Sequence, residues 1–159
     1  VLHGETLEKW TQMLTVTGIY GPAAKNGMTP AKFSTGIAAN FKRACPSTFN
    51  GSHMKGIDNI DGNPAFALIA GCGTLNMNGK IYSETALIIA IKGKKNYYTV
   101  QWAERGEAAS KPIPHDAARW MKRLESLMPI LLCPVVQGEK APYPSCISKM
   151  PTGKRRTAR

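Results

Sequence analysis

The stretch from Ala65 to Glu104, AFALIAGCGTLNMNGKIYSETALIIAIKGKKNYYTVQWAE, decides the fold. It predicts three consecutive β-strands joined by tight turns at Asn78–Lys80 and Gly93–Asn96, where glycine supplies the positive φ that short hairpins require. The middle run, Tyr82–Ile91, is apolar on both alternating faces over its last six residues. A strand with no polar face must be covered on both sides.

The third run, Tyr97–Glu104, alternates between apolar or aromatic side chains and polar ones. Tyr98, Val100 and Trp102 share one face, and polar residues occupy the other. This pattern predicts a half-buried strand nearer an edge of the sheet, with the aromatic side chains packed in the core.

Two amphipathic helices are predicted on either side of this meander. The first begins after Thr29, a good N-cap followed by Pro30, and runs through Cys45 to a stop at Pro46. The second runs from about Pro114 to Met128, with an apolar face that includes Trp120 and Leu124.

The remaining segments are less regular. Thr6–Trp10 is compatible with a short helical turn, and Leu14–Tyr20 has the β-branched alternation of a strand. Ser47–Asn63 predicts a ragged strand or a loop, and Ile130–Cys133 either a last strand or coil. The order predicts an α+β fold, in which two helices flank a mainly antiparallel sheet with a central meander. We expect one domain over residues 1–133 and a Pro-rich, basic tail over residues 134–159.

Four cysteines, an even number with no C-x-x-C pair, predict two disulfides in an exported protein. Of the three connectivities, we favour Cys45 with Cys72 and Cys133 with Cys146, the second pinning the tail to the core. The other interpretation is four free buried thiols in a cytosolic protein. Residues 1–5 lack the basic end and apolar run of a signal peptide, so we expect either that the protein stays where it is made or that the segment has been removed or omitted from this chain.

The net charge of +11 is concentrated in part in the tail. The residues that could contact an anion or a partner lie in one predicted turn and after Cys146: Lys92, Lys94, Lys95, Lys149, Lys154, Arg155, Arg156 and Arg159. The tail is either a solvated segment or a contact with nucleic acid, an anionic membrane surface or an acidic protein.

Candidate catalytic residues are few. Cys72, in Ala70–Gly73 at the end of a buried strand, could be presented as a nucleophile, and His115 lies beside Asp116 near the start of a helix. We expect Cys72 to form a disulfide or to be a buried core thiol, and Asp116 to act as a first-turn charge. No phosphate loop, dinucleotide fingerprint or G-x-S-x-G occurs, so we expect no cofactor and no metal.

The run Glu5–Val16, with its pattern E-x-x-E-x-W-T-x-M, resembles the start of small exported bacterial proteins of unassigned function. The layout of helices around an antiparallel sheet is similar to that of PsbP-like and DcrB-like periplasmic domains. This resemblance implies export to the periplasm or beyond, a disulfide-compatible setting and a binding or assembly role without catalysis.

The leading hypothesis is therefore an exported, non-enzymatic domain that binds a protein partner or an envelope component, in the manner of an immunity, inhibitor or secretion-associated protein. The second is a small hydrolase or toxin-like enzyme that uses Cys72 or His115. The third is a nucleic-acid or anionic-surface binder that acts through the basic tail. The oligomeric state is left open.

Overall fold

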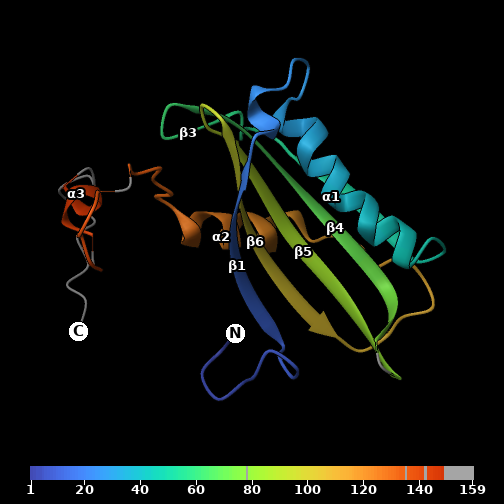
Figure 1. Cartoon of the computed structure of the whole chain (residues 1–159). Coiled ribbons are helices and arrows are strands. Elements are labelled where there is room, and N and C mark those ends of the chain that lie inside the picture. Colours follow the sequence, from blue (N-terminus) through green and yellow to red (C-terminus); the bar gives the residue numbers. More distant parts are fainter. Residues whose placement is uncertain (78, 135, 142, 149–159) are drawn as a thin grey trace.

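The computed structural model describes residues 1–77, 79–134, 136–141 and 143–148. Its centre is an antiparallel sheet of six strands in the order β1-β6-β5-β4-β2, with β3 paired to β4 (Figure 1). The strands are β1 Gln12–Tyr20, β2 Phe49–Met54, β3 Asn59–Ile60, β4 Asn63–Met77, β5 Lys80–Lys92 and β6 Asn96–Gly106. The helices are η1 Pro22–Ala24, α1 Pro30–Ala44, α2 Ala117–Leu127 and α3 Pro144–Ile147. The predicted α+β fold and the meander β4-β5-β6 are confirmed.

Strand β5 is buried on both faces, as its sequence predicts. Leu87, Ile89 and Ile91 pack in the cluster that contains Trp120 and Leu124 of α2. Residues 86, 88 and 90 point the other way, into clusters that include side chains of α1. The two helices therefore cover opposite faces of the sheet.

Helix α1 begins where its cap signal predicts. The Thr29 hydroxyl accepts a hydrogen bond from the Lys32 N–H, and Pro30 occupies the first turn. Near this end the Phe33 ring stacks on Tyr97 of β6, with ring centroids 4.2 Å apart. The predicted apolar stripe of α1 thus lies on the sheet.

Helix α2 begins at Ala117, three residues later than the predicted start. Asp116 is its N-cap, because the carboxylate accepts a hydrogen bond from the Arg119 N–H. Two basic residues of α2 also connect it to the sheet, since Arg119 and Arg123 both form ion pairs with Glu104 of β6.

The two hairpins use glycine for different reasons. Gly79 has φ +77°, as the turn between β4 and β5 predicts; Asn78 lies outside the described residues. Gly93 does not have a positive φ, so that part of the prediction is wrong. A Cβ on Gly93 would lie 3.0 Å from the Tyr98 ring and 3.2 Å from the Asn96 carbonyl, so close packing explains this glycine.

Two of the segments predicted to be less regular contain the strands at the two edges of the sheet. The predicted strand Leu14–Tyr20 is β1, which starts at Gln12 and pairs with β6. Residues 6–10 form no helix. Ser47–Asn63 contains β2, at the opposite edge from β1, and the two-residue strand β3. Ile130 and Leu132 pack on the α2-side cluster as coil.

Both favoured disulfides are present, Cys45–Cys72 and Cys133–Cys146. The first joins the end of α1 to β4. Both cysteines of the second lie after α2, so it closes a loop within the C-terminal segment. Figure 1 shows α3 of that segment apart from the sheet, so the expectation that this bridge pins the tail to the core is not met.

Replacing Cys45 and Cys72 together by alanine should lower the free energy of unfolding by about 3 kcal/mol, because a loop of this length loses its cross-link in the unfolded chain. Urea titration followed by tryptophan fluorescence measures the change. The matched double variant of Cys133 and Cys146 should change the unfolding of the sheet by less than about 1 kcal/mol. Equal losses from both pairs would contradict the separation of the two loops.

Candidate binding site

Cys72 is not available as a nucleophile, which corrects that candidate assignment. Its side chain is fully buried and bonded to Cys45. Strand β4 also does not end there but continues to Met77 after a register shift between Cys72 and Leu75. A disulfide sulfur has no thiolate to offer for catalysis.

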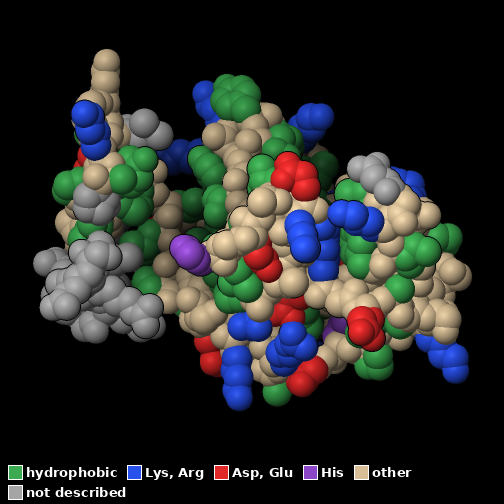
Figure 2. Space-filling view, turned by 90° about the horizontal axis from the view of Figure 1, so that it is seen from below, with side chains coloured by type: hydrophobic (Ala, Val, Ile, Leu, Met, Phe, Trp, Pro, Cys, Tyr) green, Lys and Arg blue, Asp and Glu red, His purple; other side chains and the backbone are tan. Residues whose placement is uncertain are grey.

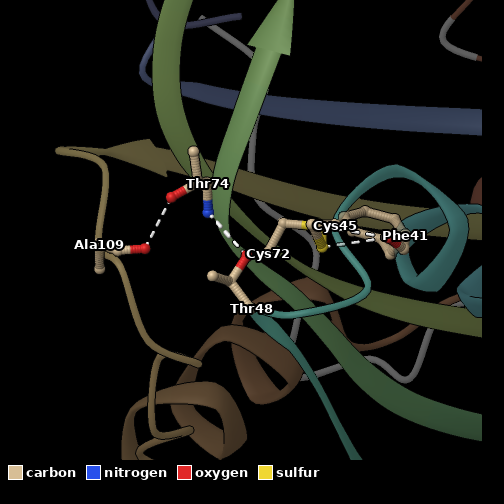
Figure 3. Close-up of a disulfide and its surroundings, with 6 residues drawn as sticks. All are labelled: Phe41, Cys45, Thr48, Cys72, Thr74 and Ala109. Atoms are coloured by element: carbon tan, nitrogen blue, oxygen red, sulfur yellow. Dashed lines mark hydrogen bonds between the residues drawn. A yellow bond between two sulfur atoms is a disulfide. The ribbon is translucent and has the colours of Figure 1, made fainter.

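The register shift in β4 joins three segments (Figure 3). The Thr74 N–H donates to the Thr48 hydroxyl, and the Thr74 hydroxyl donates to the Ala109 carbonyl. A Cβ on Gly73 would lie only 2.3 Å from the Lys111 carbonyl oxygen, so the connector between β6 and α2 crosses β4 at this glycine. The Gly-Cys-Gly sequence therefore has a structural role, because β4, the segment with Thr48 and the connector before α2 meet there.

His115 lies in the connector before α2 and faces the edge strand β2. Its Nδ1 is 2.7 Å from the Ser52 hydroxyl, beside a cavity of about 570 Å³. Its Nε2 is buried and has no hydrogen-bond partner within the described part of the chain. Burial lowers the pKa of His115 and so favours the neutral imidazole. Asp116 caps α2 instead of orienting this imidazole, which leaves a Ser-His contact without the carboxylate of a catalytic triad.

Stability should fall as the pH is lowered from 7.5 through 6.5 towards 5.5. His115 has a lowered pKa in the folded protein, so in this window the unfolded chain binds more protons and acid favours unfolding. The His115→Gln variant should show a shallower dependence of its melting temperature on pH. Ser52→Ala retains the imidazole and should keep a slope of the same sign; identical slopes in wild type and His115→Gln would contradict this role.

The basic candidates at the β5–β6 turn differ in their surroundings. Lys92 Nζ donates to the Met28 carbonyl at 3.2 Å, so it holds the α1 entry loop on the sheet. Lys94 and Lys95 are exposed at the turn. The five basic residues of the tail, from Lys149 to Arg159, lie outside the described residues.

A different group of residues, around Arg105, lines a second pocket. The Arg105 guanidinium lies 3.6 Å from the centre of the Trp10 ring and 4.3 Å from that of the Tyr82 ring. Its Nε also bonds Glu84 Oε2 at 3.0 Å. Arg105 and Glu84 are paired neighbours on β6 and β5, and the N-terminal segment brings Trp10 over them. Cation–π contact and the ion pair together fix the guanidinium in one position.

Apolar side chains surround this Arg105 stack and remain in contact with water. Leu7, Met77 and Ile81 are each more than half exposed, and they line a cavity of about 810 Å³. Lys9 and Lys80 add positive charge at its margin, and Glu8 adds one negative charge. Figure 2 looks onto the end of the molecule that is lowest in Figure 1 and shows hydrophobic side chains interspersed with Lys, Arg, Asp and Glu. We call the Arg105 stack and its apolar margin the Trp10 pocket.

No protein family, curated protein or solved structure matches this chain. None of the helices in the described ranges is long and apolar enough to cross a membrane. The residues that the structure describes contain no group of His, Cys, Asp and Glu side chains arranged to hold a metal ion.

The Trp10 pocket is not evident from the sequence alone. Its three central residues come from separate segments of the chain, at positions 10, 82 and 105, and no local pattern links them. The one signal was the alternation of β5 near Tyr82, which places Tyr82 and Glu84 on the same face of the strand.

Proposed function

We propose that this protein is an exported, non-enzymatic domain that binds an apolar segment of a protein partner in the Trp10 pocket. The observation that supports this most directly is the Arg105 guanidinium held between Trp10 and Tyr82, with exposed apolar side chains around it.

The composition of the pocket matches what proteins use to bind one another. Tryptophan, tyrosine and arginine dominate the energetic centres of protein interfaces, where a partner side chain enters a pocket that is then closed to water. Leu7 is 74% exposed and Ile81 61% exposed, and such clustered apolar exposure is costly unless a partner covers it.

The charges around the pocket indicate an acidic partner. Glu84 neutralises Arg105, which leaves Lys9 and Lys80 opposed only by Glu8. Together with a net charge of +11, this favours a segment in which an aromatic or aliphatic residue is flanked by Asp or Glu.

Export is supported by the two disulfides, which form and persist in oxidising environments. A periplasmic or secreted location fits this proposal and the resemblance carried by Glu5–Val16.

Protein isolated from its natural source and alkylated without reductant should show no added alkyl group on any of its four cysteines, because both bridges close before isolation. Intact-mass spectrometry makes the measurement, and the reduced and alkylated protein is the control. Four alkylated thiols in the unreduced sample would contradict export to an oxidising compartment.

Selection of a phage-displayed random peptide library on the protein should enrich peptides that place Phe, Trp, Leu or Ile next to Asp or Glu. An enriched peptide should bind at least about tenfold more weakly to Ile81→Asp and to Met77→Asp, because each substitution places a carboxylate in the apolar margin of the pocket. Fluorescence anisotropy of the labelled peptide gives the affinities.

Val136→Asp is the matched control, since Val136 is also an exposed apolar residue but lies in the C-terminal segment away from the pocket. It should bind the peptide like the wild type. Equal affinity of the wild type and both pocket variants would reject the pocket as the binding site.

A further inference from the structure

In the part of the chain that the structure describes, no strand pairs with the outer edge of β1. It ends the strand order of the sheet, and the strand beside it is β6. Its nine residues, Gln12–Tyr20, contain no charge and no proline. Leu14 is 51% exposed and Val16 68% exposed, although both are apolar. Long uncharged edge strands are sites where further strands pair, and proteins usually protect them.

The other edge of the sheet, strand β2, is protected against pairing with a further strand. Strand β2 is shorter, only six residues long, and mainly polar. The connector before α2 lies beside it, since Asn50 donates to the Ile113 carbonyl and Ser52 contacts His115. The openness of β1 is therefore a property of that edge and not of the whole sheet.

Hydrogen bonds at the two ends of β1 determine which backbone groups face outward. The Thr11 carbonyl accepts from the Arg105 N–H, and the Gly21 N–H donates to the Lys95 carbonyl. In an antiparallel pair the bonded residues alternate, so the odd-numbered residues of β1 direct their N–H and C=O groups to β6. Leu14, Val16 and Gly18 direct theirs to the open edge.

We infer that β1 pairs with β1 of a second copy of this chain, antiparallel, with the two-fold axis at Val16. Val16 is the midpoint of Gln12–Tyr20, so this register pairs every residue of the strand without overhang. Val16 is also one of the residues whose backbone groups face outward. Each outward-facing residue then meets another one: Val16 opposite Val16, and Leu14 opposite Gly18 of the second copy.

The side chains fit this register. Gly18 has no side chain, and a Cβ there would touch the Tyr98 ring at 3.5 Å. In the proposed dimer Leu14 of one copy fills the space above Gly18 of the other and packs against that ring. Val16 pairs with Val16 on the same face, and Thr15 pairs with Thr17 on the opposite face.

The self-complementary register favours a second copy at this edge, and the absence of charge on β1 allows two copies to meet there. Two copies that each carry +11 repel one another, so a stable contact between them requires a surface without cations. Strand β1 is such a surface. An acidic partner, in contrast, would gain nothing from a neutral strand.

The pairing also has a consequence for the Trp10 pocket, although it does not depend on it. Trp10 lies just before β1, so the antiparallel register places the two pockets at opposite ends of the shared strand pair, separated by about 40 Å. A dimer would bind a partner with two such segments far more tightly than one pocket could.

A cysteine at position 16 tests the register directly. Val16→Cys should form a covalent dimer under mild oxidation, because paired Cα atoms across the axis lie about 5.5 Å apart, within the range of a disulfide. Leu14→Cys, on the same strand and face, is the matched control. Its two copies would lie about 14 Å apart, too far for a disulfide. Non-reducing gel electrophoresis and peptide mass spectrometry identify the linked residues.

Light scattering coupled to gel filtration measures the association itself. The wild type should be a dimer, and Val16→Lys should weaken dimerisation at least about tenfold, because it places two like charges opposite one another at the axis. Val136→Lys should remain dimeric, and circular dichroism confirms that each variant is folded. A monomeric wild type, or a dimer unaffected by Val16→Lys, would overturn the proposal. Cross-linking of Leu14→Cys equal to that of Val16→Cys would overturn the register.

Discussion

The requirement to bury both faces of β5 governs this structure. Six consecutive residues of this strand, Ala86 to Ile91, are almost completely buried. Each face of a sheet that contains such a strand needs its own layer, so α1 and α2 must lie on opposite sides. The small side chains Ala86 and Ala90 lie on the α1 side, where the Phe33–Tyr97 stack and Phe41 fill the space. The α2 side is filled by larger residues, with Trp120 at its centre.

Two helices cover the middle of such a sheet and leave its margins open. The candidate binding features lie at those margins. The Trp10 pocket forms at the end of the sheet beyond α1, where the N-terminal segment and the β4–β5 hairpin meet. On strand β1, Leu14 and Val16 are exposed beside the partly buried Trp102. A partner bound in the Trp10 pocket and a second copy paired at β1 would each bury apolar side chains that a single chain leaves exposed.

The connection to α2 depends on the register shift in β4. Gly73 lets the connector cross the strand, and the Cys45–Cys72 bridge holds the end of α1 at the same place. A motif that suggests a reactive thiol in sequence is thus a meeting point of α1, β4 and the α2 connector. The same connector positions His115 against Ser52 at the protected edge.

The sequence by itself determined the parts that depend on local interactions. The meander, the two-sided burial of β5 and the start of α1 at Thr29 and Pro30 each follow from a window of a few residues, through alternation, turn chemistry and capping. The sequence left three disulfide connectivities open, and the structure shows that the favoured one, Cys45–Cys72 and Cys133–Cys146, is present. Only the tertiary structure decided that β1 pairs with β6, some eighty residues away, and that Trp10, Tyr82 and Arg105 meet. These contacts depend on the summed packing of the whole sheet, which leaves no local signal in the chain.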